Sequence, residues 1–114
     1  MVELNKDEML STILKATSDT TRRSILTTLV QEGPTRVTDL AERYEMSLNA
    51  VSKHIKVLEA VGLVTRKPLG RTHFIEANLA PVALVDQWFS QLKSVWELRL
   101  EKLENLLTEE SDHE

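Results

Sequence analysis

Polar and basic side chains recur at helical spacing within the stretch "SLNAVSKHIKVLEAVGLV" in the middle of the chain. The residues concerned are Asn49, Ser52, Lys53 and Lys56. An asparagine amide can pair with the edge of adenine, and a lysine ammonium can bind guanine or a phosphate. The same residue types also suit an ordinary solvated helix face. They therefore indicate a nucleic-acid contact only if neighbouring elements present them to DNA.

The opposite side of the same helix is apolar. At about 100° per residue, four side chains fall within one narrow arc that we expect to be buried: Leu48, Val51, Ile55 and Leu58. Ser47 is a suitable N-cap, and Gly62 follows the last turn as a C-terminal stop. Burial of the apolar arc turns the lysines and the asparagine outward.

The residues before this helix predict three more helices. Apolar residues recur with helical spacing between residues 4 and 14. A second helix follows Asp19, whose carboxylate can accept hydrogen bonds from the first turn, and it stops at Gly33. A third, shorter helix covers residues 37–44. Because only a turn at residues 45–47 separates it from the lysine-bearing helix, the two form a helix-turn-helix pattern.

Two β-prone runs follow, at residues 63–66 and 72–77, on either side of Pro68 and Gly70. They predict a hairpin with a loop of several residues. Three basic residues lie at or near its tip: Arg66, Lys67 and Arg71. These either form a wing that contacts the minor groove or the DNA backbone, or they discourage aggregation at a strand edge. The predicted fold is therefore mainly α-helical with a small β-hairpin, a winged helix-turn-helix.

Four other residues have two possible roles each. His54 borders the apolar arc, where it either donates to a phosphate or covers the edge of the core. Ser47 is primarily a helix cap, although the free N–H groups at a helix N-terminus also suit a phosphate contact. Arg22 and Arg23 are expected to serve the helix surface or salt bridges rather than to bind DNA.

The longest periodic segment runs from Pro81 to Leu107, with apolar residues at steps of three and four. Such a helix would be about 40 Å long, more than a domain of this size can bury, so we expect it to pack against another subunit. Trp88 and Trp96 are expected in that interface, with a ligand pocket as the alternative. Residues 108–114 are expected to form a disordered acidic tail.

Composition narrows the possible functions. The chain has no cysteine, which excludes disulfides, thiolate metal sites and thiol catalysis. Residues 36–77 carry seven Lys/Arg against five Asp/Glu, whereas residues 78–114 carry three against eight. No apolar run suits a membrane span and no signal-peptide pattern is present, so we expect one cytoplasmic domain. No Gly-rich phosphate loop or nucleophile–base spacing indicates an enzyme.

The chain resembles the ArsR/SmtB family of bacterial winged-helix repressors. The resemblance covers roughly residues 14–107 and rests on "LKATSDTTRRSILTTL", on "VTDLAERYEMSLNAVSKHIKVLEAVGLV" and on "GRTHF". It implies that residues 47–61 form the DNA-recognition helix and that a dimer forms through the first and last helices. The implied dimer-interface residues are Leu10, Leu14, Val85, Phe89, Leu92, Trp96, Leu100 and Leu103.

Three departures from the family pattern bear on mechanism. The third helix, "RVTDLAERY", has no Cys, and the last helix has Asp86 but no His, so neither a metal site nor another cofactor is expected. His113 and its acidic neighbours could hold a metal loosely, but a flexible tail is the favoured account. Glu45 stands where related turns usually have Gly, and a left-handed conformation there costs roughly 1 kcal/mol. Thr20 stands where the family often has Pro.

The sequence thus predicts a homodimeric transcriptional repressor that binds double-stranded DNA at an inverted repeat and is not an enzyme. Two alternatives stay open: a winged helix used only for protein–protein contact, and a sensor gated by a small ligand or a metal. The effector, if one exists, is not identified by the sequence. The predicted DNA-contacting residues are Ser47, Asn49, Ser52, Lys53, His54, Lys56, Arg66, Lys67, Arg71 and Thr72.

Overall fold

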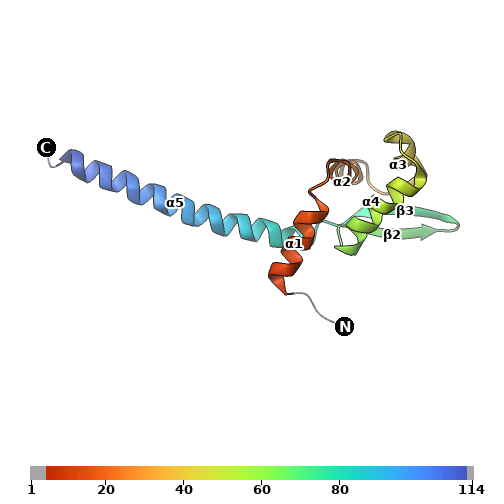
Figure 1. The fold of residues 1–114 in the computed structure, drawn as a ribbon, viewed down its shortest axis with the longest axis horizontal. Helices are drawn as coiled ribbons and strands as arrows, with labels where there is room; N and C mark the ends of the chain where they lie inside the picture. Colours follow the sequence, from red (N-terminus) through yellow and green to blue (C-terminus); the bar gives the residue numbers. More distant parts are fainter. Residues whose placement is uncertain (1–4, 113–114) are drawn as a thin grey trace. The chain divides into compact units, whose positions relative to one another are not determined.

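Five helices and a three-stranded antiparallel sheet make up the computed structural model, which describes residues 5–112 (Figure 1). The chain divides after Leu84, within the last helix, into two units that are described separately. The elements are α1 (Lys6–Ala16), α2 (Thr20–Glu32), β1 (Thr35–Arg36), α3 (Val37–Arg43), α4 (Leu48–Ala60), β2 (Val64–Leu69), β3 (Thr72–Ala77) and α5 (Val82–Asp112). The predicted mainly helical fold with a small β-hairpin is confirmed.

The core of the first unit forms where α4 meets α2, α3 and the hairpin. Three side chains of α4, Val51, Ile55 and Leu58, are 0% exposed, as predicted. They are buried together with Leu40 of α3 and Ile75 of β3, which are also 0% exposed. Full burial of one such side chain stabilises a fold by about 1.5–3 kcal/mol. This burial fixes which face of α4 looks outward.

Leu48 departs from the prediction, because its side chain is 51% exposed. It is the first residue of α4, and side chains in a helix lean toward its N-terminus. Leu48 therefore points past the end of the core, although it shares the angular position of Val51 and Ile55. The helical wheel gave the direction of the side chain correctly but not its place along the helix axis.

The hairpin is longer and its loop is tighter than predicted. β2 extends to Leu69, which is paired with Thr72, so only Gly70 and Arg71 form the turn. Gly70 has φ 63°, and a positive φ at the first of two central positions is the pattern of a type II′ turn. Pro68 lies inside β2, which is tolerated because β2 is an edge strand of the order β1-β3-β2.

A third strand, β1, was not predicted. Its two residues pair with β3, Thr35 opposite Ile75 and Arg36 opposite Phe74. A strand of two residues is too short to give an alternating pattern in the sequence. The pairing attaches the start of α3 to the same sheet as the hairpin.

Arginines from α2 hold the C-terminal end of α1. The Arg22 Nε donates to the Ala16 carbonyl at 2.6 Å, and an Arg23 guanidinium nitrogen donates to the Thr17 carbonyl at 2.7 Å. The last carbonyls of a helix lack partners within the helix and attract cations. Of the two structural roles expected for these arginines, at the helix surface or in salt bridges, the contacts with carbonyls fit the first.

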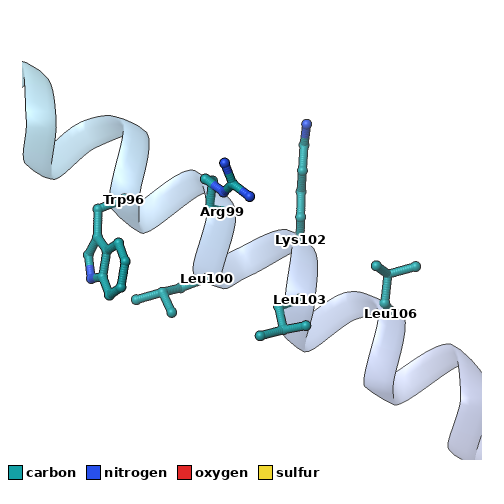
Figure 2. Close-up of a pocket in the computed structure, with 6 residues that line it drawn as sticks. All are labelled: Trp96, Arg99, Leu100, Lys102, Leu103 and Leu106. Carbon is teal, nitrogen blue, oxygen red and sulfur yellow. The ribbon is translucent and has the colours of Figure 1, made fainter.

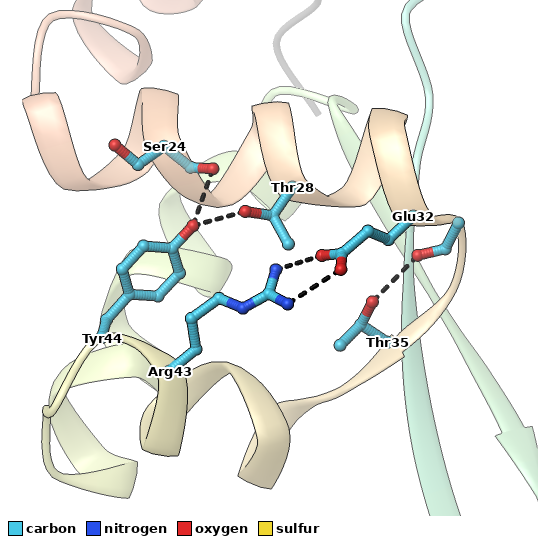
Figure 3. A network of polar contacts seen from close by, with 7 residues as sticks. Ser24, Thr28, Glu32, Thr35, Arg43 and Tyr44 are labelled. Atoms are coloured by element: carbon cyan, nitrogen blue, oxygen red, sulfur yellow. Dashed lines mark hydrogen bonds and ion pairs between the residues drawn. The ribbon is translucent and has the colours of Figure 1, made fainter.

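Polar contacts join α2 to the end of α3 (Figure 3). The Tyr44 hydroxyl donates to the Ser24 carbonyl at 2.9 Å and shares a hydrogen bond of 2.5 Å with the Thr28 hydroxyl. Arg43 binds the Glu32 carboxylate with two nitrogens, one of them at 2.8 Å. This donation holds the pKa of Glu32 below its ordinary value. The partners of Tyr44 and Arg43 lie along α2, from Ser24 to Glu32. The contacts therefore hold the C-terminal end of α3 against α2.

The second unit consists of α5 from Val85 onward. The helix has 31 residues and is about 46 Å long. It continues to Asp112, past the predicted end at Leu107, so residues 108–112 are helical rather than the expected disordered tail. No Pro or Gly interrupts this stretch, and Thr108 donates to the Glu104 carbonyl. His113 and Glu114 lie outside the described residues.

None of the helices within residues 5–112 combines the length and the apolar content that a membrane span requires.

The Tyr44 contacts can be tested by a double-mutant cycle. Tyr44→Phe removes the hydroxyl and leaves the buried Thr28 oxygen without this partner, so we expect the free energy of unfolding to fall by about 1–2 kcal/mol. Thr28→Val should cost a similar amount, and the double variant should cost clearly less than the sum. Urea unfolding at one fixed protein concentration measures all four proteins. Additive losses would show that the two hydroxyls do not interact.

Candidate nucleic-acid interface

A sharp turn between α3 and α4 sets the direction of α4. The Met46 N–H donates to the Ala41 carbonyl at 3.0 Å, and Glu45 between the two helices has φ 53°. Glu45 thus has the left-handed conformation considered for it from the sequence, because related turns usually have Gly at this position. The Ser47 hydroxyl then accepts from the Ala50 N–H at 3.1 Å, which caps the first turn of α4 as predicted.

The outer face of α4 carries the polar cluster. Asn49, Lys53 and Lys56 are exposed, and Ser52 is half-buried at the edge of this face. Within residues 5–112, neither lysine lies within ion-pair distance of a carboxylate. Their charges are therefore available to an external anion.

His54 lies beside Asp19 and is largely covered. Its side chain is 22% exposed, and its Nδ1 lies 3.9 Å from the Asp19 Oδ2 at the start of α2. The pKa of Asp19 lies below its ordinary value, chiefly because the Arg22 backbone N–H donates to its carboxylate, and His54 acts in the same direction. Of the two roles expected for His54, this placement favours the one at the edge of the core.

Two of the three basic residues predicted for the wing are bound to carboxylates. The Arg66 Nε donates to both oxygens of Glu59 on α4 at 3.2 Å. The Lys67 Nζ lies 2.6 Å from the Glu76 Oε2 on the neighbouring strand. Arg71 differs, because it is exposed in the hairpin turn and pairs with no carboxylate in the part of the chain that the structure describes. The free positive charge of the wing is thus concentrated at Arg71.

A groove of about 420 Å³ lies between the start of α3, the first turns of α4 and the wing. It brings together Leu48, Ser52, Arg66, Arg71 and Thr72, which are far apart in the sequence. Sequence reasoning did not place the four further lining residues at this site: Arg36, Val37, Thr38 and His73. Arg36 reaches the groove only because β1 pairs with β3, and its guanidinium binds Asp39 at 2.9 and 3.1 Å.

The geometry supplies cations and hydrogen-bonding groups on one surface. Lys53, Lys56 and Arg71 can attract phosphates, and Asn49 and Ser52 can bind base edges or backbone oxygens. In the searched part of the chain, residues 5–112, no three His, Asp or Glu side chains are gathered in a way that could hold a metal ion.

The turn between α3 and α4, the exposed polar face of α4 and the hairpin after it define a winged helix-turn-helix, a DNA-binding class of domain. Residues 17–67 match a family model described as a helix-turn-helix domain. Figure 1 shows α4 beside the β2–β3 hairpin, which is the wing of a winged helix-turn-helix.

Three known proteins place the chain more narrowly. It is 37% identical to the uncharacterized HTH-type transcriptional regulator YuzN of Bacillus subtilis (strain 168), over 68% of this chain and 87% of that protein. It is 34% identical to the arsenical resistance operon repressor of the same organism, over 56% of this chain and 61% of that protein. A crystal structure of an ArsR family transcriptional regulator has 32% identity and a TM-score of 0.73, and the match covers 85% of this chain and 97% of that chain.

The chain belongs to the ArsR family of DNA-binding transcriptional regulators. The family predicted from the sequence is confirmed, as is the prediction that this chain is a transcriptional regulator and not an enzyme.

The left-handed turn gives a stability prediction. Glu45→Gly removes the steric cost of φ 53°, about 1 kcal/mol, while the greater chain entropy of glycine offsets part of it. We expect a net gain of roughly 0.5 kcal/mol in urea unfolding. Glu45→Ala is the matched control, because alanine keeps the steric cost and should bring no gain. Equal effects of the two substitutions would mean that the backbone conformation is not what matters at this position.

Proposed function

We propose that this regulator is a homodimeric repressor in which α4 of each protomer enters a major groove of an inverted-repeat operator. The observation that supports this proposal most directly is that α4 has a buried apolar side and an exposed polar side. Val51, Ile55 and Leu58 are 0% exposed, while Asn49 and Lys53 are exposed on the opposite side. Recognition helices of this class place such an outer face in the major groove of DNA, where it meets the base edges.

The proposed contacts follow from which charges are free. Lys53 and Lys56 bind phosphates or guanine, and Asn49 binds adenine. Arg71 and Thr72 bring the wing to the backbone or the minor groove. Ser47 and Ser52 contribute hydrogen bonds at the N-terminal end of α4.

Two wing residues and one helix residue already lie beside a carboxylate of the same chain. Arg66 and Lys67 reach DNA only by sharing or leaving their carboxylate partners, Glu59 and Glu76. For His54 we favour the role at the core edge, beside Asp19, over a phosphate contact.

The proposed dimer rests on the apolar face of α5. Phe89, Leu92, Trp96 and Leu103 are each at least 50% exposed in the single chain. Trp96, Leu100 and Leu103 project from the same side of the helix (Figure 2). An apolar stripe of this length that stays exposed is costly in water, and pairing with a second chain removes it from solvent. Leu10 and Leu14 of α1 and Val85 of α5, all at least partly covered already, would complete the interface.

In such a two-fold dimer we expect the two copies of α4 about one DNA turn apart, ~34 Å, because that is the spacing of the two halves of an operator. The acidic α5 does not oppose binding in this arrangement if it lies more than a Debye length, about 8–10 Å, from the phosphates.

Lys53→Ala tests the proposed DNA contact. Each bound dimer loses two cations, so we expect operator affinity to fall by about tenfold or more and the slope of log affinity against log salt to become less steep by about two. Fluorescence anisotropy at several salt concentrations measures both quantities. Lys15→Ala on α1 removes the same charge elsewhere and should leave both unchanged. If the wild-type protein shows no salt-dependent DNA binding, the result would favour the alternative, a winged helix used only for protein–protein contact.

Trp96→Glu tests the proposed dimer. A carboxylate in an apolar interface lacks a partner, so we expect monomers in analytical ultracentrifugation at concentrations where the wild-type chain is dimeric. Ser94→Glu carries the same charge on the opposite side of α5 and should remain dimeric. A dimer that survives Trp96→Glu would place the interface on another surface.

A further inference from the structure

Leu48 is an apolar side chain that stays half exposed on the helix that we propose to enter DNA. It is 51% exposed in the first turn of α4, whereas the next apolar residue along its arc, Val51, is 0% exposed. Half of its apolar surface thus contributes nothing to burial within the first unit. A single exposed leucine needs no explanation by itself, but the position of this one does.

Leu48 forms an apolar part of the wall of the groove between α4 and the wing. The neighbouring wall is polar and includes Ser52, one turn further along α4, and Arg71 and Thr72 of the wing. Of the arginines in this groove, Arg36 and Arg66 are bound to carboxylates, which leaves Arg71 free among the described residues. The groove therefore combines one apolar surface with hydrogen-bonding groups and a free cation.

The major groove of DNA offers one apolar group that could match this surface. Each base pair presents donors and acceptors there, but only thymine presents a methyl group, at its C5 position. Residues at the N-terminal end of a recognition helix are the ones that reach base edges in this class of domain. Leucine can neither donate nor accept a hydrogen bond, so its only means of selecting a base is apolar contact.

We propose that Leu48 selects thymine at one base pair of each operator half-site by packing against its C5-methyl group. The inference rests on the proposed function, because it requires α4 in the major groove. Arg71 and Thr72 hold the adjacent backbone, and Ser52 hydrogen-bonds next to the contacted base. Leu48 then determines the preference at that base pair, in addition to the adenine contact of Asn49. The phosphate contacts of Lys53 and Lys56 supply affinity that depends little on sequence.

Replacement of thymine by uracil in the DNA removes this methyl group and nothing else. An operator is first obtained by selection of random-sequence duplexes with the wild-type protein. Each thymine is then replaced singly by deoxyuridine, and affinities are measured for the wild-type protein, Leu48→Ala and Val57→Ala. Val57 is the matched control, because it is apolar, 39% exposed and further along the same helix.

For the wild-type protein we expect one thymine in each half-site at which uracil weakens binding by about fourfold, the effect of burying one methyl group. Replacement in both half-sites should give roughly 15-fold. Leu48→Ala should bind the thymine operator more weakly and lose the difference between thymine and uracil at that position alone. Val57→Ala should keep the difference. The circular dichroism spectrum and melting temperature of Leu48→Ala should match those of the wild-type protein, because the residue is not in the core.

Two results would overturn the assignment: no thymine at which uracil matters to the wild-type protein, or a difference that persists in Leu48→Ala. Unchanged DNA binding by Leu48→Ala, with a partner protein lost instead, would also overturn it in favour of a protein contact. Failure of the selection to yield any DNA that the wild-type protein binds would refute the proposed function itself, which is a separate outcome.

Discussion

Burial of Val51, Ile55 and Leu58 is the constraint on which the remaining structure depends. Their burial fixes the orientation of α4 about its own axis. That orientation determines which side chains of the helix are exposed. The cap at Ser47 and the left-handed Glu45 then determine where the helix begins and how it leaves α3. An error of one residue in register would turn each side chain by about 100° and bring lysines toward the core.

The net charge of −4 matters less than which charges are already paired. Glu59 and Glu76 bind two cations of the wing, and Asp39 binds Arg36 at the groove. Lys53, Lys56 and Arg71 remain without carboxylate partners among the described residues. A binding surface in an acidic protein thus depends on local pairing, because charges further away than a Debye length are screened.

Most of the helical architecture could be predicted from periodicity and caps, since Asp19 and Ser47 form the expected N-caps. The errors have common physical causes. Leu48 is exposed because angular position does not report where a core ends along a helix. The hairpin loop was overestimated because Pro68 is compatible with an edge strand, and β1 is too short for any pattern. The ion pairs of Arg66 and Lys67 join different elements, so they cannot be found without the fold.

Pro68 has a consequence for how folded chains can associate. It presents no N–H on β2, and β1, the strand at the other edge of the sheet, has only two residues. Neither border of the sheet is therefore a good template for the backbone of a second molecule. Growth of the sheet from chain to chain, a first step toward fibres, is therefore disfavoured at both edges.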